Sequence, residues 1–127
     1  MKSDQVNVRY IVEDVDTSIE FYTKHLGFTL GTNASPAFAD VTRGNLRLLL
    51  SGRKSSGGSP MPDGTIPIPG GWNRIELVVE DLVSEVSKLK AKGLHFRNEI
   101  LPGPAGSQIL LVDPSGNLIE LFQLKKT

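Results

Sequence analysis

The chain has 127 residues and equal numbers of basic and acidic side chains, 14 of each, so its formal net charge is zero. A neutral chain lacks the basic excess typical of nucleic-acid binding, and no apolar run reaches the ~20 residues of a membrane helix, so we expect neither partner. The absence of cysteine excludes disulfides, thiolate metal sites and a cysteine nucleophile. Without a signal-peptide pattern at the N-terminus, the composition predicts one cytoplasmic globular domain over residues 1–127.

The first half of the chain, about residues 5–51, begins with a strand-like segment over residues 6–14 that ends in Val-Glu-Asp. Apolar residues then recur at helical spacing, and Thr17 with Glu20 forms a capping box, which predicts that a helix begins there. Gly27 is predicted to end this helix and to be followed by a second strand. Two apolar segments joined by a Gly-Asn turn complete the half: residues 38–41 and 44–50. Glycine and asparagine adopt the backbone conformations that such turns require, so we predict a βαβββ module.

The middle of the chain, about residues 51–72, is rich in glycine, proline and serine. Proline cannot occupy a central strand and glycine weakens a helix, so this segment is predicted to be a loop. A loop of this length is typical of a linker, a lid or a binding loop. Its apolar residues exceed what a passive tether needs and are expected to pack on the mouth of a ligand site or on a partner subunit: Met61, Ile66, Ile68 and Trp72.

The second half, about residues 73–124, repeats the pattern of the first. Residues 73–81 again end in Val-Glu-Asp, and apolar residues at helical spacing follow from Leu82. Two apolar segments joined by a Pro-Ser-Gly-Asn turn close the half: residues 109–112 and 116–122. The whole chain is therefore predicted to be an α+β protein of two βαβββ modules joined by the middle loop.

This duplicated unit resembles the vicinal oxygen chelate superfamily, which comprises glyoxalases, bleomycin-resistance proteins and ring-cleaving dioxygenases. The resemblance is carried by VEDVDTSIEFYTKHLGF at residues 12–28 and by VDPSGNLIELF at residues 112–122. It implies a single domain in which the two modules form an open, curved, barrel-like sheet with a concave cavity for a small-molecule ligand. It also implies a homodimer, because short two-module members usually pair. Lyases, isomerases, dioxygenases and drug-sequestering proteins share this fold, so the fold alone does not select a function.

Metal-dependent members of the superfamily place ligands on the first and last strands of each module. Counting from the Val-Glu-Asp segments and the Gly-Asn turns assigns these positions to Asn7, Leu48, Arg74 and Glu120. Only Glu120 is a good ligand for a divalent ion, and Arg74 is a permanent cation that opposes one. We therefore predict no metal ligand set and no cofactor, with a divalent metal kept as the alternative.

Arg74 and Glu120 are predicted to form an ion pair where relatives hold a metal, because a lone carboxylate in a partly dry cavity is costly. Arg9 and Glu76 fall on the same face of the two first strands, so the cavity is expected to contain two arginines and two glutamates. The alternative is that these residues only satisfy one another and support the barrel. The arginines are expected to keep both glutamates ionised, which argues against an acid–base pair.

Two aromatic residues complete the candidate site. Trp72 is predicted to be an aromatic wall beside the cavity or, alternatively, a core or interface anchor, and Phe122 to line the pocket or the core. No catalytic residue is predicted, and the full ligand-binding set is Asn7, Arg9, Leu48, Trp72, Arg74, Glu76, Glu120 and Phe122. These residues favour a metal-free protein that binds a small organic ligand over an enzyme. The alternative is a metal-dependent glyoxalase-type lyase, isomerase or dioxygenase with a degenerate or dimer-shared metal site.

Overall fold

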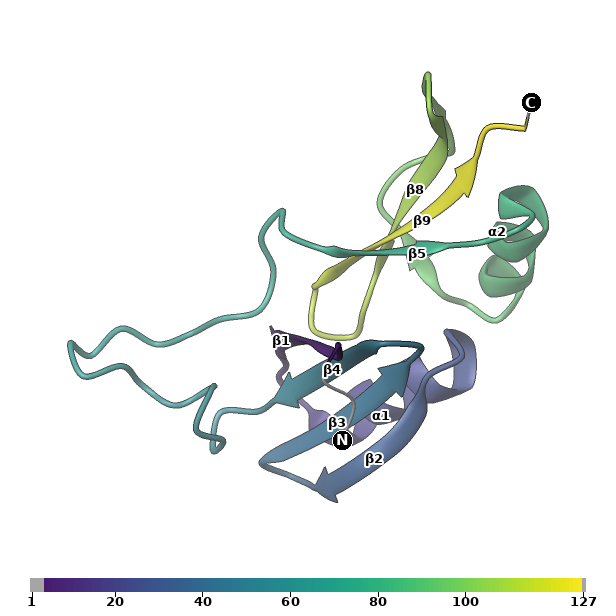
Figure 1. Ribbon diagram of the computed structural model, residues 1–127. Helices are drawn as coiled ribbons and strands as arrows, with labels where there is room; N and C mark the ends of the chain where they lie inside the picture. Colours follow the sequence, from purple (N-terminus) through teal and green to yellow (C-terminus); the bar gives the residue numbers. More distant parts are fainter. Residues whose placement is uncertain (1–3, 127) are drawn as a thin grey trace. The chain divides into compact units, whose positions relative to one another are not determined.

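The computed structural model describes residues 4–126 and divides into two compact units, one ending at Gly70 and the other beginning at Gly71. The first unit contains β1 (Val6–Ile11), α1 (Val15–His25), β2 (Thr29–Ala34), β3 (Phe38–Arg43) and β4 (Leu46–Ser51) (Figure 1). The second unit contains β5 (Ile75–Val78), α2 (Leu82–Ala91), β6 (His95–Phe96), β7 (Leu101–Pro102), β8 (Gly106–Val112) and β9 (Leu118–Leu124). Residues 4–126 are therefore α+β, with one small mixed sheet in each unit, neither of which closes into a barrel, as expected for two βαβββ modules. In the second unit the short strands β6 and β7 share the place of one strand, and both pair with β8.

Both helices begin at an aspartate that caps the first turn. The Asp14 carboxylate accepts a hydrogen bond from the Thr17 backbone N–H at 3.0 Å, and the Asp81 carboxylate accepts one from Ser84 at 3.1 Å. Aspartate at this position satisfies backbone donors that have no partner within the helix. The predicted capping box at Thr17 is therefore wrong: the helix begins two residues earlier, at Val15.

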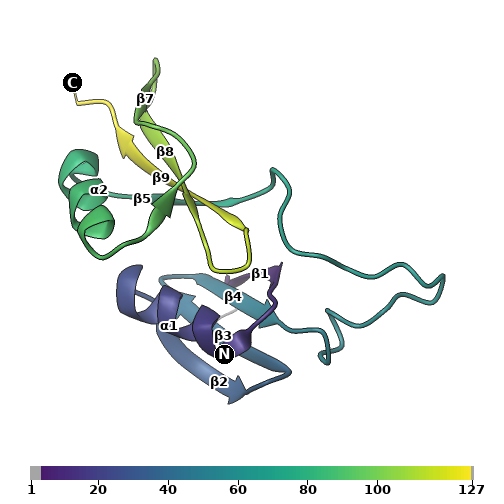
Figure 2. The same ribbon diagram turned by 180° about the vertical axis from the view of Figure 1, so that it is seen from behind.

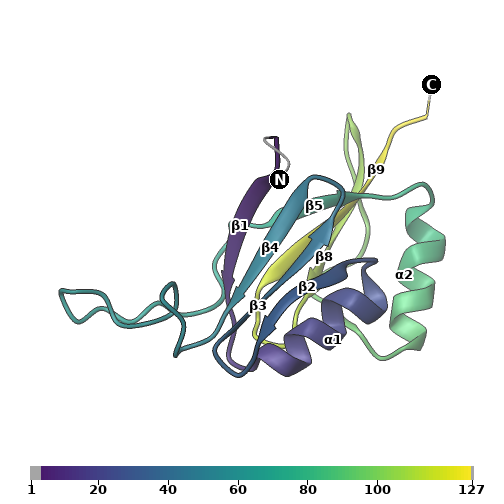
Figure 3. The same ribbon diagram turned by 60° about the horizontal axis from the view of Figure 1, so that its bottom comes forward.

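The sheet of the first unit has the strand order β1-β4-β3-β2, with β1 parallel to β4 (Figure 3). The helix α1 covers one face of this sheet (Figure 2). Side chains alternate between the two faces of a strand, and the helix-covered face is apolar and fully buried at Ala39, Val41, Leu48 and Leu50. We call the opposite side the open face of the sheet; it carries Asn7, Arg9, Asp40, Arg47, Leu49 and Ser51.

The sheet of the second unit has the order β5-β9-β8-β6, with β5 parallel to β9. Its α2 face is apolar and buried, at Ile75, Leu77, Ile109, Leu111, Ile119 and Leu121. Its open face carries, in register across the strands, Glu76, Gln108, Leu110, Glu120 and Phe122. No helix within residues 4–126 is long and apolar enough to cross a membrane.

The prediction that Leu48 lines the ligand site is wrong, because Leu48 is fully buried on the α1 face. The error comes from the turns used for counting. Two residues join β3 to β4, whereas five residues, 113–117, join β8 to β9. A shift of one residue moves a side chain to the other face of the sheet, so the open-face counterpart of Glu120 in the first unit is Leu49.

Candidate functional site

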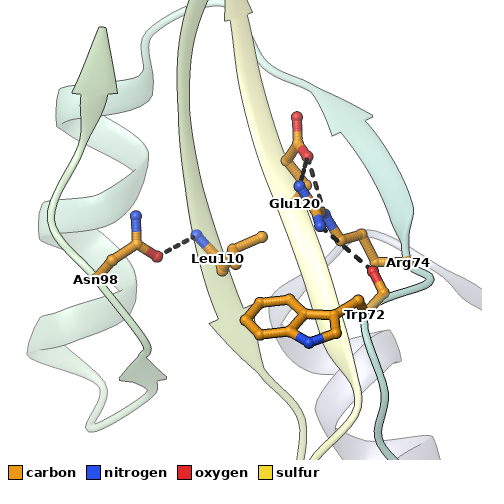
Figure 4. Close-up of polar contacts among 5 residues, drawn as sticks. All are labelled: Trp72, Arg74, Asn98, Leu110 and Glu120. Carbon is orange, nitrogen blue, oxygen red and sulfur yellow. Dashed lines mark hydrogen bonds and ion pairs between the residues drawn. The ribbon is translucent and has the colours of Figure 1, made fainter.

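An ion pair between Arg74 and Glu120 is the centre of the open face of the second unit (Figure 4). The Arg74 Nε and Nη2 atoms donate to Glu120 Oε1 at 3.0 and 2.8 Å, and Nη1 donates to the Trp72 carbonyl at 3.3 Å. The Glu120 side chain is only 10 % exposed, so this partner offsets much of the cost of burying its charge. The predicted Arg74–Glu120 pair is confirmed.

Gln108 is a second partner of Glu120 that the sequence-based set did not include. With its amide nitrogen turned toward Glu120, Gln108 donates hydrogen bonds to both carboxylate oxygens at 3.0 Å. Residue 108 lies on the same face as Glu120 because it pairs with Phe122 across β8 and β9. The alternation of side chains along β8 was the signal that could have identified it.

Glu76 lies directly opposite Glu120 in the register of β5 and β9. A hydrogen bond to the Glu120 carboxyl, partial burial and the negative charge of Glu120 together raise the pKa of Glu76, although Arg74 opposes the change. Because Arg74 bonds to Glu120, its positive charge does not outweigh these effects on Glu76; that both glutamates are ionised stays a prediction. The Glu76 carboxyl group keeps its proton to a higher pH than an ordinary glutamate does.

Phe122 and Leu110 provide the apolar part of this face. The Phe122 ring lies over Gly106: a Cβ atom added to that glycine would stand 2.7 Å from Phe122 Cζ. A side chain at residue 106 would collide with the Gln123 backbone carbonyl as well as with this ring, so glycine is required for their close approach to β8.

Trp72 reaches this face from the segment that precedes β5. Its side chain is largely exposed, so it is not a core anchor, and the Arg97 guanidinium lies 4.4 Å from the centre of its ring. Arg97 is itself held in the ladder of β8, because its backbone N–H donates to the Leu110 carbonyl at 2.8 Å. The Asn98 side chain accepts a hydrogen bond from the Leu110 N–H at 3.1 Å, so residues 97 and 98 are both bonded to β8 (Figure 4).

The structure thus brings together five of the predicted residues on one unit: Trp72, Arg74, Glu76, Glu120 and Phe122. Two others, Asn7 and Arg9, lie on the open face of the first unit. There the Arg9 Nη1 atom donates to the Ser51 hydroxyl at 2.9 Å, and the guanidinium packs against Gly57 of the middle loop.

The open face of the first unit also holds an ion pair that the sequence did not reveal. Arg47 Nη2 donates to Asp40 Oδ2 at 2.8 Å, and the Thr32 N–H donates to Oδ1 at 3.2 Å. Burial opposes ionisation of Asp40, but the hydrogen bonds from Arg47 and Thr32 outweigh it and keep the pKa of Asp40 below its usual value. The pair runs diagonally between β3 and β4, so no sequence motif marks it.

The middle loop stays close to the end of β1 over part of its length. A hollow of about 350 Å³ lies there, lined by Ile11, Val12, Glu13, Arg53, Gly58, Pro67 and Pro69. Of the apolar residues that were expected to pack on a ligand mouth or a partner, Met61, Ile66 and Ile68 are exposed on this unit. Their packing against a partner stays a prediction.

Comparison with known proteins relates this chain to one family. Residues 4–121 match the model of the Glyoxalase/Bleomycin resistance protein/Dioxygenase superfamily. The sequence matches none of the curated proteins with which it was compared.

Solved structures share the fold over almost the full length of the chain. A superfamily member from Sphaerobacter thermophilus DSM 20745 is 24% identical, with a TM-score of 0.76, and the match covers 97% of this chain and 98% of that one. TnmS3, an antibiotic binding protein from Streptomyces sp. CB03234, is 22% identical, with a TM-score of 0.74 and 98% coverage of both chains. Lactoylglutathione lyase from Agrobacterium tumefaciens is 16% identical, with a TM-score of 0.73 and coverage of 96% and 94%. At these identities the likeness establishes the fold and leaves the ligand open.

Proposed function

Because this chain belongs to the Glyoxalase/Bleomycin resistance protein/Dioxygenase superfamily, we propose that it binds a small organic ligand on the open face of its second sheet, without a metal ion. One observation carries the proposal: the carboxylate of Glu120 is already bound by Arg74 and Gln108. Around this pair lie an exposed indole, an aromatic ring and the Glu76 carboxyl. Polar groups of fixed orientation beside apolar surface are typical of a small-molecule site.

The residues at the metal positions of the superfamily do not fit a metal ion. The resemblance to the superfamily assigns these positions to Asn7, Arg74, Glu120 and Leu48, and the strand register puts Leu49 on the open face in place of Leu48. Leucine offers no donor atom, the asparagine amide is a weak ligand, and the arginine cation repels a divalent ion. Within either unit, the described residues include no group of three or more His, Asp or Glu side chains that could hold a metal.

Binding is favoured over catalysis because the charged groups of this face mainly satisfy one another. Arg74 is bound to Glu120 and to the Trp72 carbonyl, and Glu76 stands opposite Glu120 in the strand register. Hydrogen bonds hold the Arg74 and Glu120 side chains in a fixed orientation, which a site needs in order to select a ligand. The homodimer and the cytoplasmic location stay predictions.

Two measurements test the proposal. Elemental analysis of protein purified without an affinity tag is expected to find no stoichiometric metal, and Ni, Zn, Mn and Fe(II) salts are expected to leave the melting temperature unchanged. A metal that binds only the folded state must raise that temperature, so stoichiometric metal or a clear shift would contradict the metal-free site. Titration of ¹⁵N-labelled protein with small organic acids and aromatic compounds is expected to move the amide resonances of residues 72–78, 106–110 and 118–122.

A further inference from the structure

Four side chains lie in one row across the open face of the second sheet. Glu76 pairs with Glu120, and Glu120 pairs with Leu110. The pairing of β6 with β8 continues to Arg97, whose N–H bonds to the Leu110 carbonyl. Residues directly opposite each other project from the same face, so Arg97 stands at one end of the row and Glu76 at the other.

The contact between Trp72 and Arg97 crosses this row. Trp72 precedes β5 at one edge of the sheet and Arg97 follows β6 at the opposite edge, with β9 and β8 between them. Three strand spacings separate the two edge strands by roughly 14 Å, yet the guanidinium lies 4.4 Å from the indole centre. The two side chains must therefore extend toward each other above β8 and β9, and the indole lies across these strands in Figure 4.

The arginine at the end of the row has no ion-pair partner. Arg74 is neutralised by Glu120, whereas none of the ion pairs among residues 4–126 includes Arg97, which stands at the opposite end of the row from Glu76. A guanidinium that lies over an aromatic ring keeps its N–H donors at its rim, where they can bind a carboxylate in two places. Arg97 thus offers a cation to an anionic ligand, and the contact with the indole fixes the position of that cation.

An apolar surface adjoins this cation. Trp72 is 62% exposed, an unusual exposure for the largest apolar side chain, and exposed aromatic surface of this kind marks binding sites. Leu110 and the Phe122 ring, whose Cζ atom lies close to Gly106, extend the surface along β8 and β9.

Resting on the function proposed above, we propose that Trp72 and Arg97 recognise an aromatic carboxylate: its carboxylate pairs with the Arg97 guanidinium, and its ring packs on the indole and on the apolar surface of Leu110 and Phe122. A carboxylate matches the two-point donor geometry of arginine. A flat ring matches both the indole and the ring of Phe122.

The chain contains a single tryptophan, so its fluorescence reports on this place alone. The probes are benzoate, benzyl alcohol, which lacks the charge, and cyclohexanecarboxylate, which lacks the aromatic ring. Benzoate is expected to change the Trp72 emission and to bind about tenfold more tightly than either analogue. Benzyl alcohol loses the charge-assisted contact with Arg97 and cyclohexanecarboxylate loses the packing of an aromatic ring on the indole, and each loss corresponds to roughly a tenfold change in affinity. Each affinity is confirmed by calorimetric titration, which does not depend on the fluorophore.

Variants assign the two contacts. Arg97→Gln is expected to lower the affinity for benzoate about tenfold and to leave the affinity for benzyl alcohol unchanged. Trp72→Ala is expected to lower the affinity for both aromatic probes, whereas Trp72→Phe should retain most of it. The matched control is Arg53→Gln in the first unit, an exposed arginine whose loss should change none of the affinities. Because Trp72 and Arg97 are both exposed, these variants are expected to keep the wild-type circular dichroism spectrum.

The inference and the proposed function fail in different ways. Equal affinity for benzoate and cyclohexanecarboxylate, or an Arg97→Gln variant that binds benzoate normally, would overturn the inference. Organic acids that move the amide resonances around Glu120 without changing the Trp72 emission would leave the proposed function standing and overturn the inference. If no organic probe binds by either method, the proposed function itself fails.

Discussion

The open faces of the two sheets each hold one arginine–carboxylate pair, but the pairs come from different strands and have different neighbours. In the first unit Arg47 on β4 bonds to Asp40 on β3. In the second unit Arg74, just before β5, bonds to Glu120 on β9. A sequence repeat therefore need not place equivalent charges at equivalent positions, even where the strand order of the two sheets is alike.

The neighbours of each pair determine how its carboxyl groups titrate. Asp40 has the donors of Arg47 and Thr32 around it, and its pKa is lowered. Glu120 instead faces Glu76 across the parallel strands, and the pKa of Glu76 is raised. The first pair thus favours an ionised carboxylate, whereas the second unit brings together two carboxyl groups that compete for one arginine.

The largest expected change in stability tests the register of β4. Leu48→Ala is expected to lower the free energy of unfolding by about 3 kcal/mol, because Leu48 is fully buried under α1. Urea denaturation measures the change. The control is Leu30→Ala on β2, which is 40% exposed and should cost less than about 1 kcal/mol. Equal costs would mean that Leu48 does not lie in the core and that the count from the turns was right.

Breaking the two ion pairs is expected to have the next largest effect. Arg47→Ala and Arg74→Ala should each cost about 2 kcal/mol, since each leaves a mostly buried carboxylate without its main partner. The cost lies below the ~3–5 kcal/mol of a fully buried pair because both arginines are partly exposed to water. The exposed Arg53→Ala serves as the control and should change stability by no more than about 0.5 kcal/mol. If only one of the two variants is destabilised, only the ion pair of that unit contributes to stability.

The pKa values of Asp40 and Glu76 shift in opposite directions, so their contributions to the free energy of unfolding should depend on pH in opposite ways. Asp40→Asn should cost about 1 kcal/mol at pH 7, because the lowered pKa of Asp40 contributes stability above its ordinary value of 3.8. That contribution is lost as the pH falls below 3.8, so wild type and variant should converge in acid. Denaturation curves recorded across the acid range measure the difference, and a constant difference would contradict the shift.

Glu76→Gln should have the smallest effect and the opposite sign. The raised pKa of Glu76 contributes stability that is present below its ordinary value of 4.5 and is lost as the pH rises through the higher value of the folded state. The neutral glutamine avoids that loss, so the variant is expected to be about 0.5 kcal/mol more stable than wild type at pH 7. The same denaturation series tests this, and a destabilised variant whose difference does not change with pH would show that Glu76 and Glu120 do not repel each other.

Local pattern was enough to predict much of this molecule. The alternation of apolar residues located the main strands, and helical spacing located both helices, because each signal depends on a few neighbouring residues. The Arg74–Glu120 pair could also be predicted, because the resemblance to the superfamily assigns both residues to ligand positions on neighbouring strands. The Asp40–Arg47 pair could not, because it depends on how β3 and β4 align diagonally.

The sequence by itself therefore determined the two βαβββ modules, the loop between them and the family to which they belong. Only the tertiary structure decided that Leu48 lies in the core, that Gln108 completes the bonding of Glu120, and that the Trp72 side chain meets Arg97 above the sheet. The physical reason is that turn length sets register, and a change of one residue moves every side chain of a strand to the other face. Contacts between strands that are distant in sequence leave no periodic signal from which they can be read.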